Sequence, residues 1–94
     1  MAEYKIGMVA LTRGAALSRG IDELRLALPD ATITAPDETG IFEVAIEADS
    51  FENALERVWN GVAAGGADDD IAFAEHPEIP EHWRYRVATP NQAD

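Results

Sequence analysis

Cysteine is absent from this 94-residue chain. Its absence excludes a disulfide framework, a thiol nucleophile and a cysteine-ligated metal site. No apolar run is long enough to span a bilayer, and the first residues lack the charged segment and apolar stretch of a secretory signal. From these absences we expect a cytoplasmic protein with no membrane contact.

Basic residues are scarce. One lysine and six arginines stand against eighteen acidic residues, which gives a net charge of -11. A field of this sign repels the phosphate backbone of nucleic acids and anionic membrane surfaces. The composition therefore predicts an acidic protein whose partners include neither nucleic acid nor membrane.

Two parts of the chain repeat one pattern, a short strand followed by a helix with an apolar stripe. The stripe residues recur at offsets of four, three and four, which places them on one narrow arc of a 3.6-residue helix. These residues are Leu17, Ile21, Leu24 and Leu28 in the first helix, and Phe51, Leu55, Val58 and Val62 in the second.

Strand-like segments flank the two helices, at residues 4–11, 31–35, 41–48 and 71–75. The resulting order, β-α-β-β-α-β, is that of the split βαβ or ferredoxin-like arrangement. We predict an α+β fold in which two helices cover one face of a four-stranded antiparallel sheet. The strand that begins at residue 4 and the strand that begins at residue 41 carry the most apolar residues, so we expect both in the middle.

The chain divides into three parts by pattern. Residues 1–75 form the predicted ferredoxin-like domain, and residues 76–88 form an extension that packs either on that domain or on a partner. Residues 89–94 have no periodicity and are predicted to be a disordered tail.

Local signals predict how each helix begins. Thr12 is a plausible N-cap of the first helix, whereas Asp49, with Glu52 three residues later, resembles a capping box before the second. Gly20 lies inside the first helix, where glycine costs about 1 kcal/mol relative to alanine. Close packing of the helix on the sheet is the structural reason we expect for it.

Metal-type ligands concentrate only between residues 68 and 82. The weak candidates there are Glu75, His76 and His82. The two histidines are six residues apart with prolines between them, unlike the i, i+4 pair of a zinc enzyme. We predict a solvated acidic segment, no metal and no cofactor. A small enzyme that uses a histidine beside a glutamate as a proton relay stays as an alternative, although no nucleophile or oxyanion donor accompanies it.

The segment Trp83, Arg84, Tyr85, Arg86 alternates aromatic and basic residues. As a strand it would present one aromatic face and one cationic face. Trp, Tyr and Arg dominate interface hot spots, so one interpretation is a surface for a partner or a second copy. The other is that Trp83 and Tyr85 close one end of a small core.

The outer face of the strand at 41–48 is a candidate surface for that segment. Ile41 and Ala45 offer it an apolar target, and Glu43 and Glu47 are placed to meet Arg84 and Arg86. Trp83, Arg84, Tyr85, Arg86, Ile41 and Glu43 are therefore the predicted interface residues.

Two parts of the chain resemble known families. Residues 11–17, with Gly14 between the first strand and the first helix, and the hairpin that follows resemble an ACT-type regulatory domain; the acidic residue that commonly precedes this glycine is missing. That resemblance implies paired domains that bind a small metabolite in this loop. Residues 71–75 and the proline-bearing residues after them resemble a subtilisin-propeptide type of inhibitor, which implies a tail that enters a protease cleft.

These observations predict a small non-enzymatic binding or regulatory module that acts through its sheet face or its C-terminal segment. Its expected partner is a second copy, as a homodimer or larger oligomer, or another protein, with a small metabolite as a further possibility. The alternatives are a protease inhibitor or intramolecular chaperone that inserts residues 76–80, and a small enzyme built on His76, His82 and Glu75.

Overall fold

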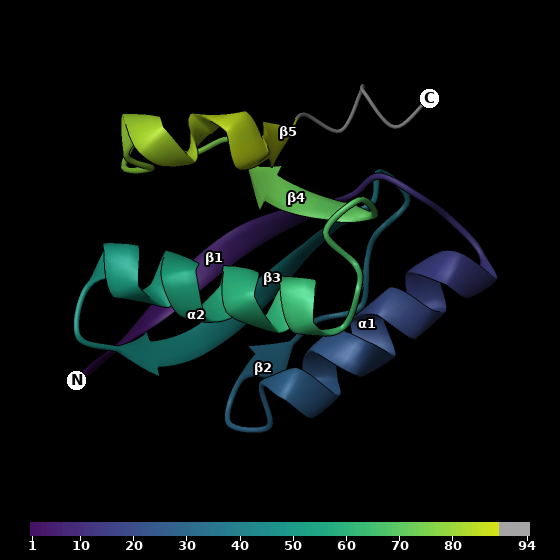
Figure 1. The fold of residues 1–94 in the computed structure, drawn as a ribbon, viewed down its shortest axis with the longest axis horizontal. Helices are drawn as coiled ribbons and strands as arrows, with labels where there is room; N and C mark the ends of the chain where they lie inside the picture. The colour runs from purple at the N-terminus through teal and green to yellow at the C-terminus, as the bar shows by residue number, and fades with distance from the viewer. Residues whose placement is uncertain (89–94) are drawn as a thin grey trace.

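The computed structural model describes residues 1–88. The predicted disorder of 89–94 concerns residues outside this range. The elements, in chain order, are β1 (Ala2–Ala10), α1 (Ala15–Ala27), β2 (Thr32–Ile33), β3 (Ile41–Ala48), α2 (Phe51–Ala64), β4 (Ile71–Ala74), the 3₁₀-helix η1 (Glu81–Arg86) and β5 (Val87–Ala88) (Figure 1).

One sheet holds all these strands, in the order β2-β3-β1-β4-β5. β1 pairs antiparallel with β3 along most of its length, from Ala2 opposite Ala48 to Val9 opposite Ile41. β2 is antiparallel to β3, and β4 is antiparallel to β1. As expected, β1 and β3 both have neighbours on their two sides.

The prediction of a four-stranded antiparallel sheet is wrong, because β5 adds a fifth strand that runs parallel to β4. Parallel neighbours need a crossover of about a dozen residues. Residues 75–86 make that crossover and contain η1, so the fold is α+β with a mixed sheet.

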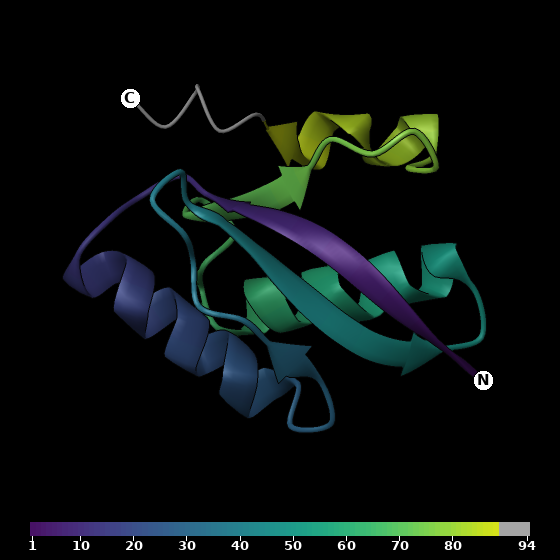
Figure 2. The ribbon, with the colours of Figure 1, turned by 180° about the vertical axis from the view of Figure 1, so that it is seen from behind.

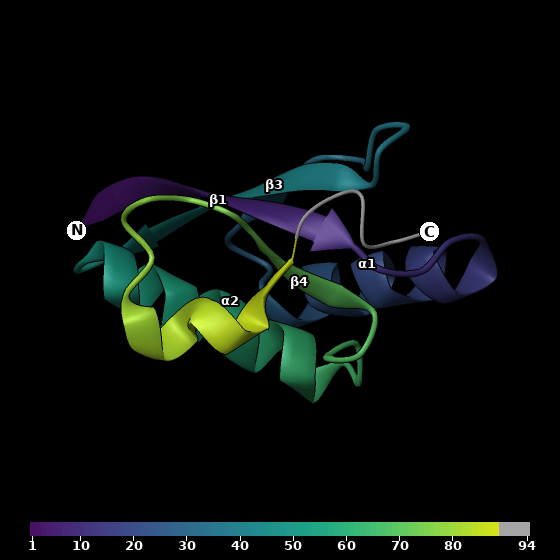
Figure 3. The same ribbon diagram turned by 90° about the horizontal axis from the view of Figure 1, so that it is seen from above.

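All three helices of the described residues lie on one side of the sheet (Figure 3). Viewed from the other side, β1 and β3 lie in front of the helices (Figure 2). The alternation of β3 follows this arrangement, because Phe42, Val44 and Ile46 are buried whereas Glu47 is exposed. We call the side without helices the open face.

The core lies between the sheet and the helices, as the two apolar stripes predicted. Leu17 and Phe51 are half-buried and pack against the core cluster. The other stripe residues belong to it: Ile21, Leu24, Leu28, Leu55, Val58 and Val62. No helix in residues 1–88 is both long and apolar enough to cross a bilayer.

Both predicted helix caps are wrong by one or two residues. α1 begins after Gly14, whose φ of 70° favours glycine, and Gly14 makes no side-chain cap bond. At α2 the cap is Ser50, whose Oγ accepts a hydrogen bond from the Asn53 N–H at 3.0 Å. Asn53 Oδ1 in turn accepts from the Asp49 N–H at 3.3 Å. Ser50 has the extended backbone of an N-cap, so its side chain satisfies the orphan donor.

The close approach that requires a glycine occurs at Gly61, where α1 and α2 meet. It does not occur at Gly20, where α1 packs on the sheet side. A Cβ at Gly61 would lie 2.9 Å from Leu28 Cγ, closer than side chains pack. At Gly20 the nearest atom to such a Cβ is 3.5 Å away, an ordinary contact. The expectation that close packing requires Gly20 is therefore wrong.

Candidate functional site

Residues 83–86, which we call the C-terminal strip, are helical rather than extended. Pro80 precedes η1 with φ -59°, and its carbonyl accepts a hydrogen bond from the Trp83 N–H at 2.9 Å. Side chains three residues apart are eclipsed in a 3₁₀-helix, so Trp83 and Arg86 share one side. The prediction of separate aromatic and cationic strand faces is wrong for this reason.

Trp83 packs against the core, as one of the two interpretations proposed for Trp83 and Tyr85, but Tyr85 is exposed and takes no part in closing the core. Its ring meets Phe73 of β4 edge to face, with the ring centroids 5.8 Å apart. It is half-buried and packs against the core cluster. Its indole Nε1 is buried and has no hydrogen-bond partner.

Arg86 lies between two aromatic rings. Its guanidinium carbon is 4.1 Å from the Trp59 ring centroid and 4.5 Å from that of Tyr85. Trp59 is 7% exposed and anchored in the core, whereas Tyr85 is 73% exposed. The cation is therefore held on a rigid ring and covered by a solvent-facing one, an arrangement that stabilises by about 0.5–2 kcal/mol.

No carboxylate in residues 1–88 pairs with Arg86, and its Nε is buried without an acceptor. Arg84 differs, since it lies 4.0 Å from Glu75 Oε1 and donates to the His76 carbonyl at 3.3 Å. A guanidinium has five donors arranged to match a carboxylate. Arg86 is thus a positioned cation without its usual counterion.

The strip and the open face lie on opposite sides of the sheet. Arg86 lies over Trp59 of α2, whereas Ile41 and Glu43 point away from the helices. Ile41 is 37% exposed and Glu43 is half-buried. The expected contact of the strip arginines with Glu43 and Glu47 is therefore not made within one chain.

His76 and His82 contact adjacent residues at the start of α2, Phe51 and Glu52, whereas Glu75 faces Arg84. His82 Nε2 lies 3.7 Å from Glu52 of α2, while Glu75 faces Arg84. His76 Nδ1 accepts a hydrogen bond from the Glu78 N–H at 3.1 Å, and its ring lies 5.4 Å from that of Phe51. Within residues 1–88 no three His, Asp or Glu side chains are grouped so that they could hold a metal ion.

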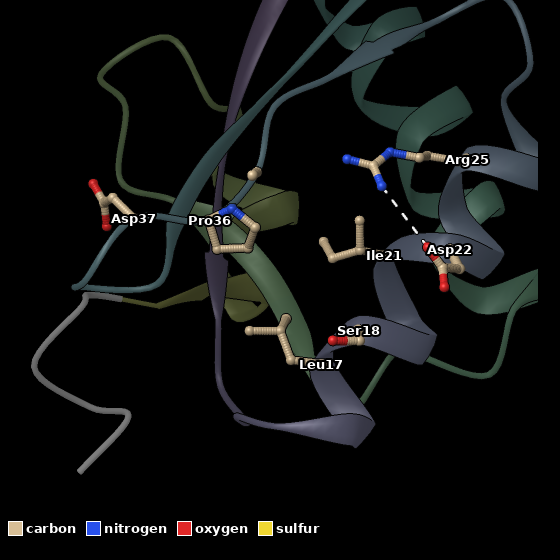
Figure 4. Close-up of a pocket in the computed structure, with 8 residues that line it drawn as sticks. Leu17, Ser18, Ile21, Asp22, Arg25, Pro36 and Asp37 are labelled. Carbon is tan, nitrogen blue, oxygen red and sulfur yellow. Dashed lines mark ion pairs between the residues drawn. The ribbon is translucent and has the colours of Figure 1, made fainter.

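A groove of about 330 Å³ lies between α1 and the loop before β3 (Figure 4). Leu17, Ile21 and Pro36 give it an apolar lining. Its polar groups are already engaged: Arg25 lies 3.8 Å from Asp22 and donates to the Ile33 carbonyl. The volume is at the small end of the range for ligand sites, and the groove suits an uncharged apolar group.

Asp37, at the edge of this groove, serves its own loop. Its Oδ1 accepts from the Thr39 hydroxyl at 2.6 Å, the Thr39 N–H at 2.8 Å and the Ile41 N–H at 3.0 Å. The Thr39 hydroxyl, followed by the Ile41 N–H, holds the pKa of Asp37 below its ordinary value. In Figure 4 its carboxylate points away from α1.

Comparisons with protein-family models, with curated proteins and with solved structures found no match to this chain. Trp59 and Phe73, the rings that hold the strip, are not identified by the sequence patterns. Trp59 did leave a signal. Its signal was a large ring on α2 directly after the stripe residue Val58.

Proposed function

We propose that this protein is a small non-enzymatic binding module that self-associates through its C-terminal strip. One observation carries the proposal: Arg86 is fixed between Trp59 and Tyr85 and has no acidic partner within residues 1–88. An exposed Tyr beside a half-buried Arg, both on a packed aromatic base, brings together residue types that anchor interfaces.

A second copy of the chain is the partner we propose, through a local contact of Arg86 with a carboxylate of the other copy, because the net charge of -11 makes two copies repel each other at longer range. Each copy carries eighteen acidic residues, so carboxylates surround any arginine that it presents. A local ion pair of this kind fixes the register of a contact and contributes specificity. The cost of ordering the strip is already met, because Trp83 and Trp59 hold it on the core.

The two other functions have weaker support. An inhibitor that inserts residues 76–80 needs a free segment, but Ile79 is 5% exposed and belongs to the core cluster. An enzyme built on His76, His82 and Glu75 needs the three groups at one point, but Glu75 faces Arg84 and no such group of three side chains occurs within residues 1–88. We also propose that β2-β3-β1-β4 with α1 and α2 form a ferredoxin-like unit to which η1 and β5 are added.

Sedimentation velocity on Arg86→Gln and Arg19→Gln tests the proposal. Both changes remove one positive charge, and Arg19 is exposed on α1 away from the strip. We expect Arg19→Gln to keep the wild-type mass distribution and Arg86→Gln to shift toward monomer. Thermal melts confirm that both variants are folded. If Arg86→Gln associates like the wild type, the strip is not the interface.

A further inference from the structure

β1 has an open edge along its first half. On one side β3 pairs with it from Ala2 to Val9, but on the other side β4 pairs with it only from Met8 to Ala10. After β4 the chain turns away from β1, and the two diverge toward the start of β1 (Figures 1 and 2). No strand of residues 1–88 therefore pairs with residues 2–6 on the β4 side.

The backbone groups that face this edge belong to Glu3 and Lys5. The Leu11 N–H donates to the Asp70 carbonyl at 2.7 Å on the β4 side, whereas the Ala10 N–H donates at 2.8 Å to the loop before β3. Consecutive residues of a strand direct their backbone groups to opposite sides, so the odd-numbered residues of β1 point toward β4. No loop backbone of residues 1–88 hydrogen-bonds to Glu3 or Lys5. Unpaired donors and acceptors of this kind are a template for a further strand.

Three rings lie on the helix side of this edge. The centroid of the Tyr4 ring is 6.2 Å from that of Phe51, at the start of α2, and the Phe51 centroid is 5.4 Å from that of His76. His76 follows β4 in the chain, so the row of rings runs from β1 to the segment that turns away from it. Tyr4 and Phe51 are half-buried, and His76 is exposed. An apolar side chain beside Tyr4 would cover this row.

The other face of the same edge carries one negative and one positive side chain. Glu3 and Lys5 are both exposed, and neither makes an ion pair within residues 1–88. Opposite charges on facing residues of neighbouring strands stabilise the pairing, and charged edge residues select against purely apolar strands. A strand that continues β4, antiparallel to β1, meets Lys5 first, Tyr4 next and Glu3 last. It is matched by an acidic, an apolar and a basic residue in that order.

We propose that the edge of β1 at residues 3–5 binds an extended segment of a partner protein with this acidic, apolar, basic sequence. The proposal goes beyond the proposed function, which concerns the C-terminal strip. Such a segment forms main-chain hydrogen bonds to Glu3 and Lys5, and its apolar residue packs on the row of rings. A second copy does not suit the edge, because its own β1 is already paired with β3 and would bring that strand into the space of residues 75–86.

Amide hydrogen exchange, followed by NMR, tests the proposal with the capped peptide acetyl-Val-Glu-Ile-Lys-Val-amide as the probe. In the free protein the Glu3 and Lys5 amides should exchange fast, whereas the Tyr4 and Ile6 amides, which point toward β3, should exchange slowly. Saturating peptide should slow the exchange of the Glu3 and Lys5 amides several-fold and leave the other two unchanged.

Backbone N-methylation of the peptide is the control for strand pairing. The N–H groups of its Glu and Lys residues face β1, whereas the N–H of its Ile points away. Methylation of the Glu or Lys nitrogen should abolish binding, and methylation of the Ile nitrogen should preserve it. On the protein, Lys5→Glu should weaken binding several-fold, because it faces the peptide carboxylate with a like charge. Arg19→Glu makes the same charge change at an exposed residue of α1 and should bind like the wild type.

Three results would overturn the proposal: Glu3 and Lys5 amides that are protected without peptide, amides that the peptide does not protect, and equal binding of the three methylated peptides. If protection instead grows with the concentration of the protein alone, a second copy occupies the edge and the proposal is wrong. Arg86→Gln keeps this test separate from the proposed function, because it alters only the strip and should bind the peptide like the wild type.

Discussion

The contact between the two long helices predicts opposite effects of one substitution at two glycines. In Gly61→Ala, the new Cβ would lie 2.9 Å from Leu28 Cγ and 3.1 Å from its Cδ1. Leu28 is 8% exposed and ends α1, so it cannot swing into solvent without opening the core. In Gly20→Ala, the Cβ meets Ala67 at 3.5 Å and Ile71 at 3.6 Å, which are normal contacts.

Two terms set the magnitudes. Alanine in a helix interior is better than glycine by about 1 kcal/mol, and this term favours both variants. Overpacking costs about 1–3 kcal/mol and applies only at Gly61. We therefore expect Gly20→Ala to raise the free energy of unfolding by about 1 kcal/mol. Gly61→Ala should leave it unchanged or lower it by up to about 2 kcal/mol.

Urea denaturation followed by far-UV circular dichroism measures both values. A third variant isolates the cause. In a Leu28→Ala background only the contact with Leu24 Cδ1, at 3.2 Å, remains, so Gly61→Ala should be less destabilising there than in the wild-type chain. If Gly61→Ala stabilises the wild-type chain as much as Gly20→Ala does, then α1 and α2 do not meet at Gly61.

Three further predictions follow from the helix cap, the charge and the loop before β3. Ser50→Ala should lower the free energy of unfolding by about 1 kcal/mol, whereas Asp49→Ala should change it little; equal losses in chemical denaturation would contradict the Ser50 cap. The melting temperature should rise with sodium chloride up to about 1 M, because salt screens the repulsion among the excess carboxylates. A melting temperature that is flat or falls would refute this expectation. Asp37 has a lowered pKa in the folded state, so its stabilisation is complete above the ordinary carboxyl pKa of about 3.9 and is lost as the pH falls through its folded value. Thermal melts of Asp37→Asn should therefore decline less steeply between about pH 5 and pH 2.5 than those of the wild type, and parallel curves would show that Asp37 contributes no pH dependence.

Long periodic segments were predictable from the sequence. Four-three-four spacing is satisfied only by a helix, so the positions of α1 and α2 followed from it. The alternation from Ile41 to Ala48 likewise gave β3 and the residues that face the helices. Each of these patterns repeats over many residues, and the apolar residues that define it are the ones that pack in the core, so local pattern and tertiary packing favour the same structure.

Short elements and long-range contacts were not predictable. The strip alternates in type, which favours a strand, but the turn at Pro80 and the packing of Trp83 on Phe73 made it helical. β5 is two residues long and has no periodicity to detect. The partner of Arg86 is Trp59, far away in the sequence, and only the folded chain brings them together.

The cap of α2 failed for a different reason. Asp49 and Ser50 are both good N-cap residues, so local preference cannot choose between them. The N-cap is the last residue with an extended backbone before the helix. Here that residue is Ser50, because α2 begins at Phe51.

Self-association is tested most directly by the native mass of the wild-type protein across concentration, at low and high salt. Sedimentation velocity should show a mass that rises above the monomer mass as protein concentration increases, and that rises more readily when salt screens the repulsion between copies of net charge -11. A single species of monomer mass under every condition would contradict the proposal that Arg86 and the strip bind a second copy.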